Sequence, residues 1–277
     1  MPTPVAGDVT GLHLPIEKYM LSAPQTAAYG HVYAAGIRAC MRRFGFDYPV
    51  GVLPSAGSDP VQRLAVLYRR YGITDAAAAR TWGYHLPSDS GASAPPALNL
   101  SQRAREVLLG RRADGGSGRV WNVPDGGCAG ESARAIDGDT PVDTQPGHGD
   151  SGIVARVKGE SFRSSLADER VKTAIRSWAA CMKGHGYQDS DPLNAGVDMT
   201  AVRSPGPNAA EVRKAVTDVA CKKSTNLTGI WFAVESQYQD TAIARHTAEI
   251  DRAGRARDVQ AANVRRLLRR YGPEAEN

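Results

Sequence analysis

A short segment around a cysteine occurs twice in this chain, and this repetition constrains the fold more than any other feature. Residues 40–46 read CMRRFGF, residues 181–187 read CMKGHGY, and a proline follows each copy, at Pro49 and Pro192. Self-similarity of this kind is typical of a duplicated unit. We therefore expect two related halves, each built around one copy.

Each copy lies at the end of a stretch whose apolar side chains recur at the spacing of one helical face. Gly45 and Gly186 then stand where a left-handed residue commonly ends a helix. Two helices with Cys-Met near their ends are therefore predicted. Their buried faces are expected to carry Tyr29, Val32, Tyr33, Gly36, Ile37, Cys40 and Met41 in the first helix, and Val171, Ala174, Ile175, Trp178, Cys181 and Met182 in the second.

The four cysteines divide evenly between the copies, because Cys128 follows the first and Cys221 follows the second. Pairing within each half predicts two disulfides, Cys40–Cys128 and Cys181–Cys221, each worth about 4 kcal/mol in the chain-entropy model. The other two connectivities remain open, as does a set of four buried thiols in a cytosolic protein. No Cys-x-x-Cys pair is present and the six histidines stand singly, so no metal site is predicted.

Composition favours helices over sheets. The chain of 277 residues is 42% hydrophobic but only 6% aromatic, and alanine supplies much of the apolar fraction. We predict a mainly α protein with two related disulfide-linked halves: residues 1–142 with an extended lead-in, and residues 153–277 with a long C-terminal helix. At most a minor β-hairpin is expected, around residues 119–124, and the stretch 137–152 is interpreted as a linker.

Capping signals predict the helix boundaries. Ser22 and Gln25 form a capping box, and Asn208 begins a helical pattern that continues to Tyr271 with a break within residues 224–229. Three shorter helices are predicted. The first is opened by Asp59-Pro60 and stopped by Gly72, the second is opened by Thr74-Asp75 and ended by Gly83, and the third is capped by Ser101 and runs through Leu109.

Charge and hydropathy argue against two kinds of partner. The formal net charge of +5 is too small to indicate a nucleic-acid partner. No stretch approaches the roughly 18 to 20 consecutive apolar residues of a membrane span. Residues 1–22 lack the basic start and apolar core of a signal peptide, so for an exported protein we expect the signal to be missing from this chain.

Several short motifs carry a resemblance to a known group of proteins. They are Leu14-Pro15-Ile16, Cys40-Met41 with Gly45, Gly83-Tyr84, residues 124–131 (PDGGCAGE), Trp178 with Cys181-Met182 and Gly186-Tyr187, and the stretch from Asp218 through Cys221 to Trp231 and Glu235. With these motifs the chain resembles a group of uncharacterised secreted proteins and lipoproteins from actinobacteria. The resemblance covers most of the chain and implies export, but it implies no activity.

Candidate chemical groups are few. Residues 149–152 read GDSG, as around a serine-protease nucleophile, but a helical chain lacks the β-barrels that complete the triad, so Ser151 is not predicted to be catalytic. His246 and Glu249 are three apart on a predicted helix and supply one ligand pair, far short of a metal–carboxylate bundle. Trp121, in a glycine-rich loop, is the candidate contact residue.

These observations favour a secreted or cell-envelope binding protein without catalytic activity or cofactor. Its expected partner is an unidentified protein or envelope polymer, and peripheral or lipid-anchored attachment is left open for the full-length precursor. The arginine-rich stretch 251–271 is interpreted as a solvated helix face rather than a site for an acidic surface. The alternative function is an extracellular hydrolase with a site between the two halves.

Overall fold

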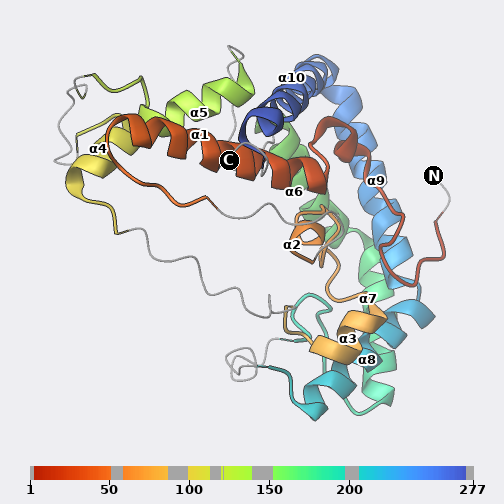
Figure 1. The fold of residues 1–277 in the computed structure, drawn as a ribbon. Coiled ribbons are helices and arrows are strands. Elements are labelled where there is room, and N and C mark those ends of the chain that lie inside the picture. Colours follow the sequence, from red (N-terminus) through yellow and green to blue (C-terminus); the bar gives the residue numbers. More distant parts are fainter. Residues whose placement is uncertain are drawn as a thin grey trace. The chain divides into compact units, whose positions relative to one another are not determined.

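The structure is a computed structural model that describes residues 3–50, 59–86, 99–112, 120, 122–138, 152–196 and 206–272. These residues form helices and no β-strand, which confirms the mainly α prediction (Figure 1). None of the described helices is long and apolar enough to cross a bilayer. The elements are η1 (Pro15–Tyr19), α1 (Ala23–Arg43), α2 (Asp59–Gln62), α3 (Ala76–Trp82), α4 (Gln102–Leu109), α5 (Gly127–Asp137), α6 (Gly152–Ala167), α7 (Glu169–Gly184), α8 (Ala209–Ser224), α9 (Leu227–Arg245) and α10 (Thr247–Tyr271).

The chain forms two compact units, and each is assembled from three separate segments. Unit 1 contains residues 1–18, 65–91 and 155–247, whereas unit 2 contains residues 19–64, 92–154 and 248–277. Both units therefore contain residues that precede the stretch 137–152 and residues that follow it. They differ in this respect from the contiguous halves, 1–142 and 153–277, that the sequence predicts.

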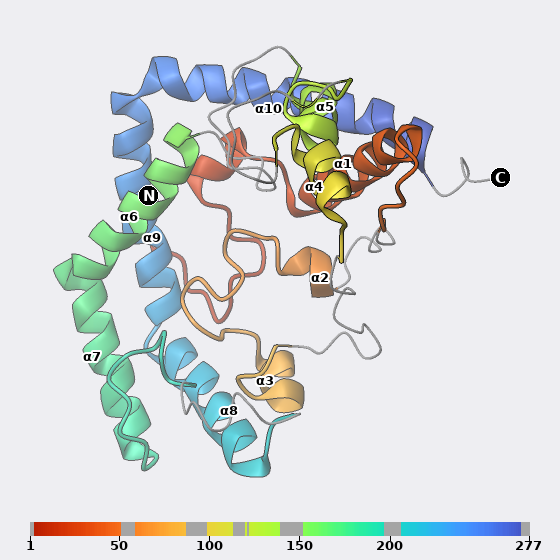
Figure 2. The same ribbon diagram turned by 90° about the vertical axis from the view of Figure 1, so that its left-hand side faces the viewer.

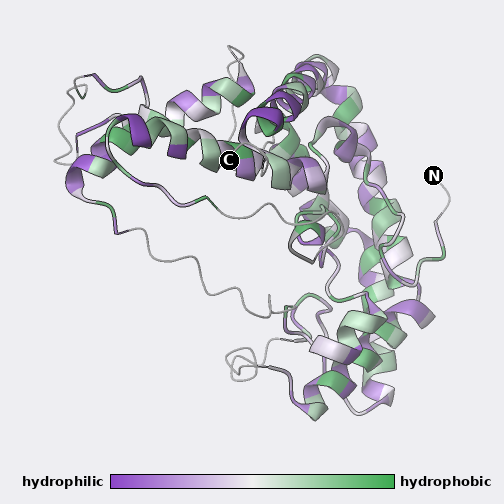
Figure 3. Ribbon diagram, viewed as in Figure 1, coloured by the Kyte–Doolittle hydropathy of each residue, from purple (hydrophilic) through white to green (hydrophobic). Residues whose placement is uncertain are grey.

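Unit 2 is organised around α1, which packs against α4 and α5. One part of its core joins Tyr29 and Val32 of α1 to Ile136 of α5 and to Val264 and Leu267 of α10. A second part surrounds Cys40 and Met41 at the other end of α1. Most of the predicted apolar face of α1 is thus buried, whereas Tyr33 and Gly36 are only partly buried. Figure 3 shows both hydrophobic and hydrophilic residues along this helix.

Unit 1 is organised around α7, α8 and α9. Helix α7 packs along α9, as Figures 1 and 2 show from two sides, and α3 packs against α8. At the centre of this unit the Trp231 ring of α9 lies 5.1 Å from the Tyr71 ring and 5.6 Å from the Phe162 ring, measured between centroids. The indole of Trp178 on α7 is also fully buried.

The predicted caps of several helices are confirmed. Ser22 and Gln25 form the reciprocal capping box of α1, and Asp75, Ser101 and Asn208 each accept hydrogen bonds from the first turn of their helices, as N-cap residues do. The predicted break within residues 224–229 is present, because α8 ends at Ser224 and α9 begins at Leu227.

The two Cys-Met helices end in the same local structure. After α1 the amide of Phe46 donates to the carbonyl of Met41, and after α7 the amide of Tyr187 donates to the carbonyl of Met182. The glycine in each turn has a positive φ, +78° at Gly45 and +88° in the second copy. Both glycines therefore act as the predicted left-handed caps.

Two predictions about helix limits are wrong. The helix expected from Asp59 to Gly72 ends at Gln62. Later in this stretch Arg69 has a positive φ, which a helix does not allow, and the side chains of Arg70 and Tyr71 bond to the buried Glu235. The pattern from Asn208 to Tyr271 has a second break, at His246, between α9 and α10. Most of the stretch 137–152, interpreted as a linker, lies outside the described residues, and α6 begins at its last residue, Gly152.

The predicted hairpin falls partly outside the described residues. Of residues 119–124, the structure describes Val120 and residues 122–124, and these form turns and irregular chain rather than a strand. Val120 and Val123 are buried in the same part of the unit 2 core as Cys40 and Cys128.

Candidate functional site

The disulfide of unit 2 joins two helices in the core. Cys40 near the end of α1 bonds to Cys128 near the start of α5, with an S–S distance of 2.00 Å and a Cα–Cα distance of 5.5 Å. Both side chains are buried. This pair is the one predicted from the sequence for the first copy.

The disulfide of unit 1 is more accessible. Cys181 near the end of α7 bonds to Cys221 near the end of α8, with an S–S distance of 1.98 Å and a Cα–Cα distance of 5.7 Å. Cys221 is buried, but Cys181 is only partly covered. This is again the predicted pair. The two bridges differ in one respect, because Cys128 lies near the start of α5 whereas Cys221 lies near the end of α8.

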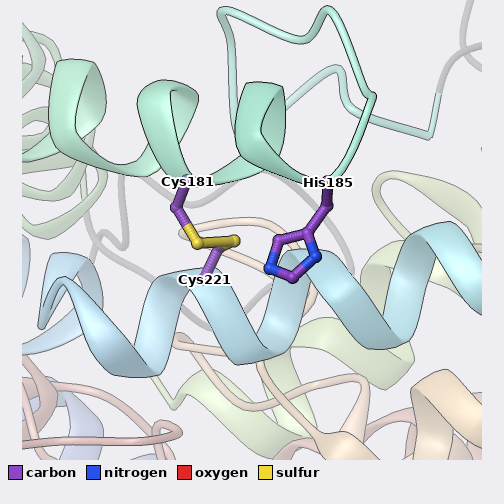
Figure 4. Close-up of side chains that lie close together, drawn as sticks. All are labelled: Cys181, His185 and Cys221. Atoms are coloured by element: carbon purple, nitrogen blue, oxygen red, sulfur yellow. A yellow bond between two sulfur atoms is a disulfide. The ribbon is translucent and has the colours of Figure 1, made fainter.

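A histidine lies beside this second disulfide. His185 follows α7 and directs its ring toward the sulfur atoms, which come from α7 and α8 (Figure 4). One ring nitrogen of His185 and the sulfurs of Cys181 and Cys221 all lie within 4.8 Å of one another. No local motif reveals this cluster, because Cys181 and His185 are four residues apart and the second sulfur comes from another helix.

An arginine-lined pocket of about 280 Å³ lies within unit 2, between α1, α5 and α10. At its α1 side the guanidinium Nη2 of Arg43 donates to both carboxylate oxygens of Glu131, at 2.8 and 2.6 Å. Both side chains are well exposed, 57% and 39% respectively. The pocket is lined by Val32, Gly36, Ala39, Cys40, Arg43, Glu131, Ser132, Ala135, Arg266, Leu267, Arg270 and Tyr271.

The α10 side of the pocket adds two further cations. Arg266 donates to Asn263 Oδ1 at 3.2 Å and to a backbone carbonyl of α5 at 3.4 Å. The guanidinium of Arg270 lies 5.3 Å from the centroid of the Tyr271 ring. The lining contains three arginines and one glutamate, so its net charge is positive. A guanidinium can donate two parallel hydrogen bonds to one carboxylate or phosphate group. The sequence predicted a basic helix here but not a pocket, because the other walls come from distant segments.

Unit 1 contains two clusters of buried polar side chains that bond to one another in the interior. The carboxylate of Glu235 accepts hydrogen bonds from Arg70, Tyr71, Ser161 and Gln239. Burial raises the pKa of the Tyr71 hydroxyl well above its usual value, so it stays protonated and donates to this carboxylate.

The second cluster is an ion pair on α8. Lys222 Nζ lies 3.1 Å from Asp218 Oδ1, and both side chains are fully buried. Trp178 and Tyr84 also donate to this carboxylate. Burial raises the pKa of Asp218 and lowers that of Lys222, while their mutual attraction opposes both shifts. Every group has an interior partner, so the cluster locks α7, α8 and the chain around Tyr84 together.

Trp121, the candidate contact residue, and Ser151 of the GDSG motif both lie outside the described residues. The remaining candidate pair, His246 and Glu249, does not share a helix as predicted. His246 is the C-cap residue of α9, and Glu249 lies in the first turn of α10. The helix is interrupted between them, so the prediction of one continuous helix through both residues is wrong.

The fold and the two bridges define the class of this protein, an all-helical protein with two disulfides. Comparison of the chain with protein-family models, with curated proteins and with solved structures finds no match. A function is therefore assigned from the chain's own side chains, above all those that line the pocket of unit 2.

Proposed function

We propose that this protein is exported and acts at the cell envelope as a binding protein without catalytic activity, whose partner is an anionic envelope polymer. The observation that carries the proposal is the arginine-lined pocket between α1, α5 and α10. An anionic polymer would enter with its phosphate or carboxylate groups against Arg266 and Arg270.

The placement of these two arginines suits a repeating anion. Arg266 and Arg270 are one helical turn apart on α10 and line the same pocket, so they can hold successive charged groups of one strand. Arg43 is occupied by Glu131 and orders the opposite wall. The volume of about 280 Å³ admits a few small groups rather than a large ligand, as expected for a site on a polymer.

Export is supported by the two disulfides, which join cysteines 88 and 40 residues apart. Such bonds persist in oxidising compartments outside the cytosol. The resemblance to secreted actinobacterial proteins and lipoproteins points the same way.

Binding of two soluble polymers, poly(glycerol phosphate) and polyglutamate, tests this proposal. The double variant R266Q/R270Q should bind the preferred polymer roughly tenfold or more weakly, since each arginine loses charge-assisted hydrogen bonds. The control R252Q/R255Q removes the same charge from α10 outside the pocket and should retain most of the affinity. The stronger ligand of the two identifies the anionic group as phosphate or carboxylate.

Thermal unfolding of both variants checks that the comparison is between folded proteins. Equal losses of affinity in the two double variants would show only a diffuse charge effect and would contradict a site in the pocket. Failure of the unaltered protein to bind either polymer would overturn the proposed function.

A further inference from the structure

We propose that Cys181, Cys221 and His185 form a redox-gated site for a thiophilic divalent ion such as Zn²⁺. In the oxidised protein the two sulfurs bond to each other, and in the reduced protein they bind the metal together with the imidazole. The inference is independent of the proposed function, because it uses other residues in the other unit.

The donor atoms are already close enough for one metal ion. A tetrahedral zinc site has Zn–S bonds of about 2.3 Å and Zn–N bonds of about 2.0 Å, so its ligand atoms lie roughly 3.5 to 3.8 Å apart. The three donor atoms here lie within 4.8 Å of one another. Once the S–S bond is broken, rotation of the two cysteine side chains separates the sulfurs to this distance while the helices stay in place.

The helices supply the framework of the site. Cys181 lies near the end of α7 and His185 directly follows this helix. Cys221 lies opposite on α8, with a Cα–Cα distance of 5.7 Å to Cys181. Two thiolates and one imidazole match the ligand types that zinc prefers. Three protein ligands leave the fourth position of a tetrahedral ion for water.

The switch between the two forms balances as a two-electron reaction. A dithiol reductant supplies two electrons and two protons and becomes a disulfide. A phosphine supplies two electrons and becomes a phosphine oxide, while water provides both protons and the oxygen. In either case the S–S bond breaks and two thiols form. Binding of Zn²⁺ then forms two Zn–S bonds and one Zn–N bond and releases the two thiol protons. A small disulfide oxidant then accepts two electrons from the thiolates and two protons from water and leaves as two thiols. The S–S bond re-forms, both sulfur ligands are lost and the metal is expelled.

Accessibility directs the reductant to this disulfide. The side chain of Cys181 is partly exposed, whereas Cys40 and Cys128 in unit 2 are 1% and 0% exposed. Reduction requires access to a sulfur atom. Mild treatment of the folded protein should therefore open Cys181–Cys221 before Cys40–Cys128.

Cobalt binding to the full chain tests the inference, because Co²⁺ replaces Zn²⁺ and gives a sulfur-to-metal charge-transfer absorption. The protein is treated anaerobically with a water-soluble phosphine, and alkylation with mass spectrometry identifies the reduced cysteines. We expect labelled Cys181 and Cys221, a cobalt–thiolate band only after reduction, and loss of that band when Zn²⁺ is added.

Three variants make the result specific. The variant H185A should weaken cobalt binding by roughly tenfold or more, since even outer-shell partners of metal ligands contribute 10- to 100-fold. The control H13A removes an exposed histidine elsewhere and should bind as the unaltered protein does. The variant C181S/C221S should show no band although it retains Cys40 and Cys128.

Circular dichroism follows the fold throughout. A reduced protein that keeps its helices but gives no cobalt–thiolate band would overturn the inference. So would a band that H185A leaves unchanged, or loss of helical structure on reduction of Cys181–Cys221, because the site requires α7 and α8 to stay in place.

Discussion

At the scale of single residues, two glycines set how closely the segments of unit 2 approach. Gly127, with φ +70°, lies directly before Cys128, and a Cβ there would lie 2.4 Å from both the Gly110 amide nitrogen and the Leu108 carbonyl oxygen. Gly110 also has a positive φ, and a Cβ there would lie 2.2 Å from the amide nitrogen of Gly127. The sequence places two glycines directly before the cysteine, but this backbone contact follows from the tertiary structure.

Substitution of Gly127 by alanine should destabilise the protein by about 3 kcal/mol or more, because it combines an unfavourable φ with a collision against backbone. Gly45 is the matched control, since it has φ +78° but no atom within 4 Å of an added Cβ. The variant G45A should therefore lose only about 1 to 2 kcal/mol. Chemical denaturation of both variants measures the difference, and equal losses would show that the contact with Gly110 contributes nothing.

At the scale of elements, Asp168 separates α6 from α7 and caps the second of them. Its carboxylate accepts hydrogen bonds from the Arg170 amide and guanidinium and from the Tyr238 hydroxyl. The hydrogen bonds from the Arg170 side chain are the largest cause that lowers the pKa of Asp168 to about 2. The charged form is thus favoured in the folded protein, and α7 begins with a charged cap.

The pH dependence of stability follows from the direction of this shift. Because the folded-state pKa of Asp168 lies below its usual value of 3.8, its stabilisation is present above about pH 4 and is lost as the pH falls toward 2. The variant D168N keeps a capping side chain without the charge. It should be less stable than the unaltered protein by roughly 0.5 to 1 kcal/mol at pH 6, and by much less at pH 2.

Urea denaturation at several pH values measures this difference in the free energy of unfolding. Other groups titrate equally in both proteins, so their effects cancel in the comparison. A difference that stays constant from pH 6 to pH 2 would mean that the charge of Asp168 contributes nothing.

At the scale of the whole molecule, each unit closes its core with residues far apart in the chain. In unit 2, Val264 and Leu267 pack with Tyr29, Val32 and Ile136. Unit 1 in turn takes Tyr71 and Ile16 from the first part of the chain, where the amide of Ile16 donates to the buried Gln239 side chain at 3.0 Å. Neither unit can be cut out of the sequence as one continuous piece.

A fragment of residues 153–277 should therefore fail to unfold cooperatively, although it contains α7 to α10 and the Cys181–Cys221 bond. It lacks the partners of Val264 and Leu267 and the Tyr71 ring that packs on Trp231. Calorimetry of this fragment, alone and mixed with residues 1–152, measures the effect, and the mixture should regain a transition. A cooperative transition in the isolated fragment would show that the second half folds by itself.

The sequence by itself determined the helical class, the caps at Ser22, Asp75, Ser101 and Asn208, and the paired left-handed ends of the Cys-Met helices. These features depend on side chains and amides within a few residues of each other, so a local pattern is enough to predict them. The favoured disulfide pairs also match those of the structure.

Only the tertiary structure decided the short α2, the break at His246, the interleaved units and both candidate sites. Tyr71 leaves its helical pattern because a buried carboxylate 164 residues away accepts its hydroxyl. The arginines of α10 become a pocket only where α1 and α5 supply the other walls. His185 likewise becomes a candidate ligand only because α8 brings Cys221 to it. Such contacts between distant segments leave no period or spacing in the sequence, so local patterns could not predict them.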